Sequence, residues 1–414
     1  MVGAGEALSL ILSSVEPLGV ERVPAGAALG RVLAEKVLSG RDIPGFDNSA
    51  MDGFAVRSAD LREASRLKPL KLKVVGTVAA GSSNLPDLQP GEAARTMTGA
   101  PICAGADAVI PVEQTRFAGD EVEIFAPVLA GFCVRPSGED VRRGEVVFEP
   151  PRLLRAADIG LLAALGRSTL GVYRRPTVGL VCTGDELVEV DEAPAHGQVV
   201  NSSAYALAAA VSEAGGLPIV LRVAPDRPDE IRRRFSEALA FDAVISTGGV
   251  SVGDFDHVKT VLDELGMRSL FHGVAQRPGK PLKFGLLGGK PVFGMPGNPT
   301  STLVCFYVYA WPALRRMGGH PRPHLPALSA RCEVEIKAGG GLTSFVRVTL
   351  RQSGDQWFAG PAGSQGSGLV GSLSRADGLL VAGPEKALLR PGDQAPVLLL
   401  APPGGDGAAA AAFL

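Results

Sequence analysis

An apolar run passes directly into a loop of glycine and acid in the stretch Val178-Gly179-Leu180-Val181-Cys182-Thr183-Gly184-Asp185-Glu186-Leu187. The run has the length and composition of a buried β-strand, and a segment with helical spacing follows the loop. Two further apolar runs, at residues 243–246 and 291–295, also end in glycine-containing loops that precede helical segments. Strands that alternate with helices at this spacing predict a right-handed, largely parallel sheet with helices on both faces.

The three loops should lie together, because ligands bind at the carboxyl ends of the strands in an open parallel sheet. Glycines let backbone N–H groups approach an anion, helix N-termini add a favourable dipole, and carboxylates can hold Mg²⁺. We therefore expect a phosphate-bearing ligand and a metal ion at this edge. The ligand-binding candidates are Thr183, Gly184, Glu186, Gly248, Gly249, Ser251, Gly253, Pro296, Gly297, Asn298 and Pro299, and the metal candidates are Asp254, Asp256 and Glu186.

Each loop also has a purely structural interpretation, in which the glycines make turns and the acids are solvated. The second loop, residues 247–256, lacks the G-x-G-x-x-G pattern, which excludes a dinucleotide fingerprint there. The cationic segment Gln276–Lys283 is similar to the end of a P-loop only superficially, because Pro281 stands where a metal-binding Ser or Thr belongs. Its Arg277 and Lys280 could neutralise a phosphate or an oxyanion, or could belong to a basic surface turn.

A second acidic segment, Asp42–Gly53, places three aspartates among turn-forming residues. Such a turn is usually solvated. Here Phe46 and Met51 would be exposed beside the acids, which favours contact of this loop with another surface.

The rest of the chain divides into smaller predicted units. Residues 4–14 predict a first helix and residues 23–37 a second short one, whereas residues 70–127 and 328–400 alternate short strands with Gly, Pro and Asp turns. The predicted boundaries are 1–41 with 141–175 for an elongated linker domain, 42–140 for a small β-domain with the acidic loop, 176–320 for the α/β domain, 327–402 for a C-terminal β-barrel or sandwich, and 403–414 for a flexible tail.

Composition excludes several classes of protein. A net charge of −2, an aromatic content of 5% and the lack of a long basic run argue against nucleic-acid binding. The five cysteines form no CxxC pair, so they support neither a zinc site nor a disulfide framework and fit a reducing cytoplasm. The first residues lack the basic start of a signal peptide, and prolines break the uncharged stretch 291–314, so no membrane segment is expected.

Seven short motifs follow one another along the chain. They are Asp47–Val56, Met97–Pro101, Gly138–Asp140, Thr183–Leu187, Gly248–Gly253, Pro278–Pro281 and Pro296–Pro299. In this order they resemble the molybdopterin molybdenumtransferase family, which includes the E-domain of gephyrin. The motifs span nearly the whole chain, and chance agreement of all seven is implausible.

The resemblance implies a transferase that inserts molybdate into adenylated molybdopterin: Mg²⁺ assists, the pyrophosphate link is cleaved, AMP leaves and molybdenum cofactor forms. It implies an elongated four-domain homodimer with a molybdopterin-binding-like α/β domain, whose site lies between that domain of one subunit and the β-domain loops of the other. The implied protein partners are the molybdopterin adenylyltransferase and cofactor-accepting apoenzymes in the cytoplasm.

The family motifs also imply roles for particular residues. Asp52, Thr98 and Asp140 would lie on the β-domain side, with Asp52 catalytic. The α/β side would be lined by Glu186, Asp226, Asp256, Pro296 and Pro299, of which Asp256 is a further catalytic candidate. Arg277 and Lys280 would be the catalytic cations near molybdate or phosphate.

One position departs from the family pattern. Many relatives carry a lysine where this chain has Gly273, so that charge would be missing or supplied by His272 or Arg277. Preference for tungstate is therefore one alternative, and a non-catalytic scaffold is another. A third is an adenylyltransferase-like enzyme, although such enzymes lack the N-terminal and C-terminal β parts predicted here.

Overall fold

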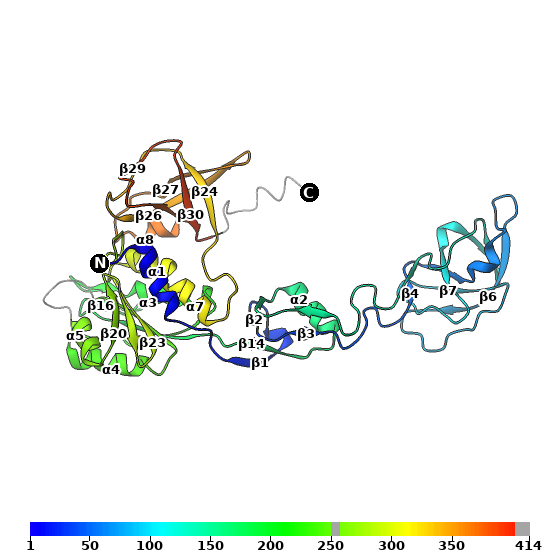
Figure 1. Cartoon of the computed structure of the whole chain (residues 1–414), viewed down its shortest axis with the longest axis horizontal. Coiled ribbons are helices and arrows are strands. Elements are labelled where there is room, and N and C mark those ends of the chain that lie inside the picture. The colour runs from blue at the N-terminus through cyan, green and yellow to red at the C-terminus, as the bar shows by residue number, and fades with distance from the viewer. Residues whose placement is uncertain (250–256, 402–414) are drawn as a thin grey trace.

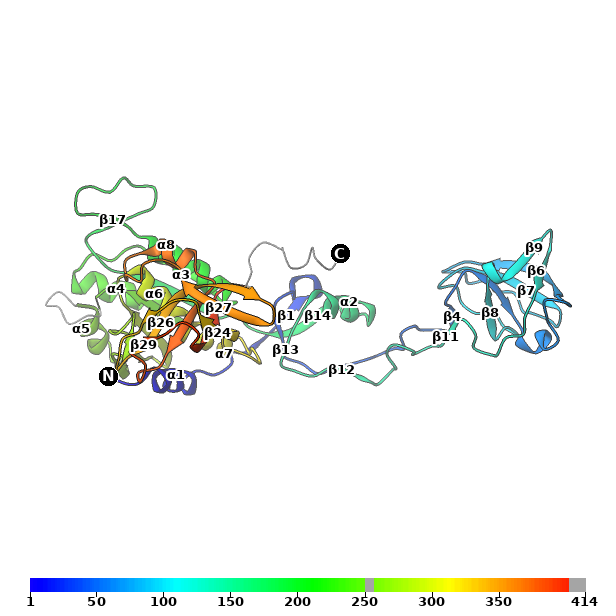
Figure 2. The ribbon, with the colours of Figure 1, turned by 90° about the horizontal axis from the view of Figure 1, so that it is seen from above.

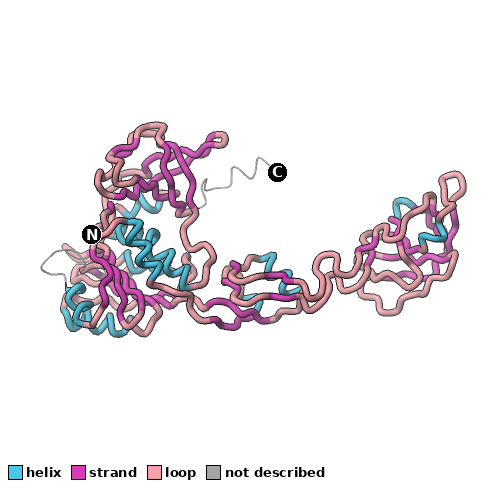
Figure 3. Tube along the Cα trace, in the orientation of Figure 1, coloured by secondary structure: helices cyan, strands magenta, loops and turns pink. Residues whose placement is uncertain are grey.

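The computed structural model describes residues 1–249 and 257–401. The molecule is elongated, with an α/β unit and a β-barrel at one end, a narrow linker in the middle and a small β-unit at the far end (Figure 1 and Figure 2). Strands dominate the small β-unit and the barrel, whereas most helices lie in the α/β unit (Figure 3). The predicted fold class, a multidomain protein with α/β and β parts, is confirmed.

The α/β unit is built on a six-stranded sheet. Its strand order is β18 (Leu217–Val220), β15 (Thr177–Cys182), β19 (Ala243–Thr247), β23 (Lys290–Met295), β22 (Lys283–Leu287) and β20 (Arg268–His272). The first four strands are parallel, and the last two form an antiparallel extension. β15 and β19 are almost entirely buried because both faces of the sheet are covered.

Helices cover the two faces of this sheet. They are α3 (Ser202–Glu213), α4 (Pro228–Ala238), α5 (His257–Glu264), α6 (Pro299–Cys305), the π-helical turn η4 (Phe306–Ala310) and α7 (Trp311–Met317). Alternate side chains of a strand enter opposite layers: Val178 and Leu180 pack with α3 and α7, whereas Val181 packs with α4 and α5. The helical stretch 299–317 contains η4 because Pro312 has no N–H to bond to the carbonyl of Val308.

Helix α1 (Ala4–Ser13) packs on the α/β unit, whereas the predicted boundary 1–41 assigns it to the linker. Ala7 and Ile11 are fully buried in the same cluster as Leu314 of α7. The backbone of the segment after α1 is also held there, since the N–H of Leu18 donates to the carbonyl of Met317 (2.7 Å). The position of α1 is determined by burial of its apolar face against α7, which is remote in sequence.

The linker is a narrow β-structure with one helix. Its sheet order is β1 (Val20–Pro24), β14 (Thr169–Tyr173), β2 (Val32–Leu33) and β13 (Arg152–Leu153), with α2 (Ala156–Ala164) beside it and a further pair, β3 (Val37–Leu38) with β12 (Val146–Phe148). The predicted helix at 23–37 is wrong. Only a 3₁₀ turn, η1 (Ala25–Ala27), forms there, and Gly30 has a φ of +71°, which no helix accommodates.

The far β-unit is a six-stranded sheet with a short pair beside it. The order is β8 (Ala108–Pro111), β5 (Gly53–Val56), β7 (Glu92–Thr96), β6 (Leu70–Val78), β10 (Glu121–Ile124) and β9 (Thr115–Ala118), and β4 (Asn48–Ser49) pairs with β11 (Val134–Arg135). The 3₁₀ turns are η2 (Ser58–Leu61) and η3 (Val112–Gln114). Gly53 begins β5 where a Cβ would lie 2.0 Å from the carbonyl oxygen of Ile110, so only glycine fits after Asp52.

The C-terminal unit is a closed barrel. Its sheet order is β21 (Gln276–Arg277), β26 (Thr343–Ser353), β27 (Gln356–Pro361), β24 (Ala327–Cys332), β30 (Gln394–Leu399) and β28 (Gly378–Ala382), and β26 also pairs with β28. Smaller elements are β25 (Ile336–Lys337), β29 (Leu388–Leu389) and α8 (Val370–Ser374). The added strand β21 belongs to the cationic segment of the α/β unit, so it ties that segment to the barrel.

Within residues 1–249 and 257–401, no helix is both long enough and apolar enough to cross a membrane.

Candidate functional site

The predicted glycine loops meet at one edge of the α/β sheet. Thr183 follows β15, and its N–H donates to the carbonyl of Thr247 at the end of β19 (3.1 Å). The N–H of Gly248 donates to the carbonyl of Met295 at the end of β23 (3.3 Å). Gly248 has a φ of +87°, and a Cβ there would lie 2.7 Å from the carbonyl oxygen of Thr183. Glycine is therefore required where the loops touch.

Acidic side chains surround the loop after β15. The N–H of Asp185 donates to Asp226 Oδ2 (3.4 Å), and the N–H of Asp226 donates to Asp185 Oδ1 (3.1 Å). The exposed Glu186 folds back over Gly184, where a Cβ would lie 2.4 Å from Glu186 Oε2. The structure thus brings Asp226 to the corner of the sheet edge where Gly184 and Glu186 lie.

The loop Pro296–Pro299 completes this edge and connects it to the barrel. A Cβ on Gly297 would lie 3.6 Å from the Cα of Gly248, so the second and third loops are in contact. Asn298 occupies the N-cap position of α6, but its side chain makes no capping hydrogen bond. Its Nδ2 instead donates to the hydroxyl of Ser367 in the barrel (3.3 Å).

A cavity of about 740 Å³ lies between the α/β unit and the barrel. Arg277 and Lys280 line it from the first unit, and Lys337 and Arg347 line it from the second; we call it the cationic cavity. Arg277, Lys280 and Lys337 have no hydrogen-bond or ion-pair partner among the described residues. Ser301, two residues after the Pro296–Pro299 loop, also lines it, so the cavity adjoins the glycine loops.

Arg347 was missed by the sequence analysis. It lies within β26, is 1% exposed, and donates from Nη2 to the carbonyls of Ser364 (3.1 Å) and Gly366 (3.2 Å). Its Nε has no partner in the described part of the chain. Burial lowers the pKa of Arg347, but an arginine stays charged. The one sequence signal was a charged residue inside the apolar run Phe345–Val348, where a buried cation needs an anionic partner.

The predicted catalytic carboxylate of the β-unit is held by one threonine. Asp52 Oδ1 accepts hydrogen bonds from the hydroxyl and from the backbone N–H of Thr98, both 2.7 Å. The hydroxyl bond and then the amide bond lower the pKa of Asp52, because both stabilise the charged form. Asp52 is exposed, and it is therefore ionised and accessible near neutral pH.

The other acids of that loop fasten its backbone. Asp42 accepts from the N–H of Arg143 (2.7 Å), and Asp47 accepts from the N–H of Ser137 (2.7 Å). Asp140 is exposed, and its own N–H donates to the carbonyl of Ile43 (2.9 Å). The loop is thus an ordered structure in which Asp52 and Asp140 keep their carboxylates available.

The two halves of the predicted site are far apart in one chain. The loops that carry Asp52 and Thr98 belong to the β-unit, and the glycine loops and the cationic cavity belong to the opposite end of the molecule (Figure 1). The linker separates them in both perpendicular views (Figure 2). The structure therefore places the described α/β candidates at one end of the molecule and the β-unit candidates at the other.

Four predicted residues, Ser251, Gly253, Asp254 and Asp256, lie outside the described residues. Within 1–249 and 257–401, no group of three or more His, Cys, Asp or Glu side chains is arranged to hold a metal ion.

Gly273, the departure from the family pattern, has a structural reason. Its φ is +85°, and a Cβ there would lie 3.0 Å from Cγ of Met1. The N–H of Val2 donates to the carbonyl of Gly273 (3.1 Å), and Val2 pairs with Val274. A lysine at this position would be strained against the first residues of the chain.

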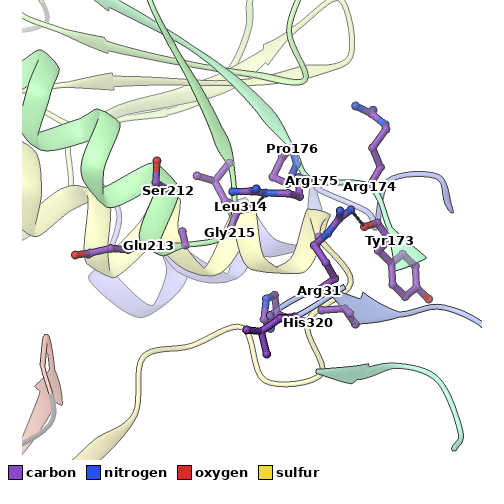
Figure 4. A pocket seen from close by; sticks show the side chains of 15 residues that line it. Arg31, Tyr173, Arg174, Arg175, Pro176, Ser212, Glu213, Gly215, Leu314 and His320 are labelled. Atoms are coloured by element: carbon purple, nitrogen blue, oxygen red, sulfur yellow. Dashed lines mark hydrogen bonds between the residues drawn. The ribbon is translucent and has the colours of Figure 1, made fainter. Parts of the chain in front are cut away.

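A second arginine-rich pocket lies where the linker joins the α/β unit, and Figure 4 shows it; we call it the junction pocket. Arg31 donates to the carbonyl of Tyr173 (2.9 Å) and pairs with Glu21 (2.5 Å). Arg175 donates to the carbonyls of Gly215 and Gly216, both at 3.0 Å. No predicted site residue lines this pocket; Arg31 bonds within the linker, whereas Arg175 ties the connecting segment to the α/β unit.

Comparison with known proteins gives matches along nearly the whole chain. Three family models match in order: "MoeA N-terminal region (domain I and II)" over residues 3–166, "Probable molybdopterin binding domain" over 179–316, and "MoeA C-terminal region (domain IV)" over 329–400. The molybdopterin molybdenumtransferase of a Nostoc species is 38% identical over 87% of this chain and 84% of its own length. That of Bacillus subtilis is 33% identical over 86% and 84%. The crystal structure of a molybdopterin biosynthesis moeA protein from Pyrococcus horikoshii OT3 is 30% identical, covers 96% of this chain and 100% of that one, and gives a TM-score of 0.82.

Proposed function

The chain belongs to the molybdopterin molybdenumtransferase family, and from this premise we propose that it inserts molybdate into adenylated molybdopterin, with release of AMP and formation of molybdenum cofactor. One observation of the structure supports this most directly. The cationic cavity adjoins the glycine loops at the sheet edge and contains the buried Arg347 together with Arg277 and Lys280, which have no partner in the described part of the chain. A pterin phosphate and an oxyanion can therefore be bound side by side.

The two anions have different binding surfaces in this proposal. The N–H groups of Thr183 and Gly248 are bonded to neighbouring strand ends, so the phosphates are bound beside the Pro296–Pro299 loop, where the N–H of Gly297 has no acceptor among the described residues. Molybdate, a compact dianion, lies in the cationic cavity, beside the exposed side chains of Arg277 and Lys280. Both anions then lie at the boundary between the α/β unit and the barrel.

Cleavage of the pyrophosphate link requires stabilisation of negative charge more than it requires a nucleophile from the protein. Cleavage between phosphates builds negative charge on the departing oxygen, and fixed cations lower that barrier if they are already in position. Lys280 and Arg277 fill this role. Molybdate supplies the positioned oxygen, and no nucleophilic Ser-His or Cys-His pair is required.

We propose that Mg²⁺ binds at the acidic corner of the sheet edge, held by Glu186 together with Asp254 and Asp256. Glu186 is exposed, and carboxylate oxygens are the ligands that Mg²⁺ prefers. When bound, Mg²⁺ would add positive charge beside the phosphates. Removal of Mg²⁺ with EDTA is expected to stop AMP release and to be reversed by added Mg²⁺; unchanged release in EDTA would remove the metal from the proposal.

We propose further that the protein acts as a homodimer whose second copy supplies Asp52, Thr98 and Asp140. In one chain these residues lie at the far end from the cationic cavity (Figure 1). The linker also exposes apolar side chains, among them Val20 at 58% and Leu38 at 45%, which a second copy could cover. Light scattering should give twice the 42.7 kDa mass of one chain.

The first experiment measures AMP release by the purified protein with adenylated molybdopterin, Mg²⁺ and molybdate. Molybdate-dependent release with formation of cofactor is expected. Tight pterin binding without AMP release would contradict the proposal and favour a scaffold. Release that needs tungstate in place of molybdate would identify a tungsten enzyme.

Asp52→Ala tests the β-unit half of the site. Because Asp52 lies in an exposed loop, its loss should leave the melting curve unchanged while AMP release falls at least about 10²-fold. Wild-type turnover in this variant would remove Asp52 from the catalytic residues.

Mixed dimers test whether the site forms between two chains. Asp52→Ala and Lys280→Ala chains are each expected to be inactive. Unfolded and refolded together in equal amounts, they would form mixed dimers with one intact site, restoring about one quarter of the wild-type activity. No recovery in mixtures that demonstrably contain mixed dimers would show that Asp52 and Lys280 act within one chain or not at all.

A further inference from the structure

A buried polar network lies directly under the cationic segment. Gln276 is 1% exposed, and its Nε2 donates to the carbonyls of Pro278 (3.0 Å) and Gly279 (3.4 Å). On its other side, Oε1 of Gln276 accepts a hydrogen bond from the hydroxyl of Tyr309, which is fully buried. One glutamine therefore connects the helical layer to the backbone on which Arg277 and Lys280 stand.

Tyr309 sets the orientation of this amide. Burial raises the pKa of Tyr309 far above its ordinary value, so the hydroxyl stays protonated and donates. The acceptor must be Oε1 of Gln276, which leaves Nε2 to face the two carbonyls. Tyr309 lies in the π-helical turn η4, and such turns commonly occur at functional positions.

Strand β21 connects the hydrogen bonds of Gln276 to the side chains that line the cationic cavity. Gln276 and Arg277 are consecutive residues of the strand, so their side chains point to opposite faces. Gln276 is buried and Arg277 is exposed in the cationic cavity. Gly279 lies so close to α6 that a Cβ there would be 2.3 Å from Cys305 Sγ. The cationic segment therefore packs against the end of α6, directly before the turn η4 that carries Tyr309.

We propose that Gln276 and Tyr309 are positioning residues that hold Arg277 and Lys280 in the orientation in which they bind the oxyanion substrate. This inference rests on the proposed function, since it concerns the same cavity. The two residues touch neither substrate nor pterin. They act on the affinity for molybdate by keeping the cationic segment ordered before the anion arrives.

Tyr309→Phe is the first test, because it removes one hydroxyl and keeps the ring that packs in the core. The molybdate concentration for half-maximal AMP release should rise about five- to tenfold, as expected for one lost buried hydrogen bond. The KM for adenylated molybdopterin should change less than about twofold. Tyr307→Phe is the matched control: its hydroxyl, on the same turn, bonds to Glu213 (3.3 Å) away from the cationic segment, and its removal should change neither constant.

Gln276→Met, of similar size, should raise the molybdate requirement by at least as much as Tyr309→Phe. If the tyrosine acts through the glutamine, the double variant should be no worse than Gln276→Met alone. Additive effects would show that Tyr309 acts elsewhere. A lower melting temperature with an unchanged molybdate requirement in both variants would show a merely structural network and overturn the proposal.

Equilibrium dialysis of molybdate against the same proteins separates this inference from the proposed function. If the wild type binds molybdate but releases no AMP, the proposed function fails, and weaker molybdate binding by Tyr309→Phe and Gln276→Met would still support the positioning role. If the wild type neither binds molybdate nor releases AMP, both are overturned.

Discussion

The cationic cavity and the junction pocket are both rich in arginine, yet they differ in what their arginines do. In the junction pocket (Figure 4), Arg31 and Arg175 bond to carbonyl oxygens of the chain itself. Arg31 also pairs with Glu21. In the cationic cavity Arg347 likewise bonds to carbonyls, whereas Arg277 and Lys280 have no hydrogen-bond or ion-pair partner among the described residues. The number of positive residues does not distinguish an anion site from a structural junction, whereas the availability of their N–H groups does.

Among the variants that test this comparison, Lys280→Ala should cause the largest loss of activity. Loss of a fixed cation beside the reacting phosphate should lower kcat/KM for AMP release by about 10²- to 10³-fold, with an unchanged melting curve because Lys280 is exposed. A change below threefold would show that the cationic cavity is not the site of chemistry.

Arg277→Lys asks whether the cavity needs the forked guanidinium or only a positive charge. Lysine keeps the charge but cannot offer two parallel N–H donors to an oxyanion, so the molybdate requirement should rise about tenfold while kcat falls less. Equal kinetics in the two proteins would mean that charge alone matters at this position.

Arg175→Met makes the matched change in the junction pocket. The carbonyls of Gly215 and Gly216 lose their donors, and the free energy of unfolding should fall by about 1–3 kcal/mol. The kcat/KM per folded molecule should not change, as chemical denaturation and kinetics on the same preparation would show. A large loss of activity without a loss of stability would place Arg175 in the functional site and break the comparison.

Asp242→Asn should cause the smallest change, a loss of stability whose size depends on pH. Burial tends to raise the pKa of Asp242, but hydrogen bonds from Arg174 and Thr177 outweigh it and lower the pKa to about 2. A carboxylate with a lowered pKa contributes stability above its ordinary value of 3.8 and loses it as the pH falls towards 2.

Wild type should therefore exceed Asp242→Asn in stability at pH 7 by about 1 kcal/mol or less, because Arg174 is partly exposed. The difference should shrink as the pH falls from about 4 to 2 in paired thermal melts. A difference that stays constant over this range would contradict the assignment of the stabilising charge to Asp242.

Local sequence predicted the central strands of the α/β sheet well and the linker poorly. β15, β19 and β23 form as predicted, since each is a short apolar run that ends in turn-forming residues. The segment 23–37 was mistaken for a helix because its strands pair with β14, which is far away in the sequence. Helix α1 was predicted, but its packing against α7 depends on contacts across most of the chain.

The candidate site divides in the same way. Thr183, Gly184, Gly248 and the Pro296–Pro299 loop could be found because glycine, proline and acid at strand ends have a local meaning. Arg347 could not, because an arginine in a strand is ordinarily on the solvent face, and only the closed barrel buries it. The network of Gln276 and Tyr309 joins residues 33 positions apart and has no local pattern.

The sequence by itself determined the parallel strands, the loops at their carboxyl ends and the candidate side chains of those loops, because strand propensity, turn formation and charge are properties of neighbouring residues. The tertiary structure alone decided which cations remain unpaired, which are bound to carbonyls, and that Asp52 lies at the other end of the molecule from Lys280. Those facts depend on the three-dimensional path of the chain, in which residues remote in sequence either meet or are held apart.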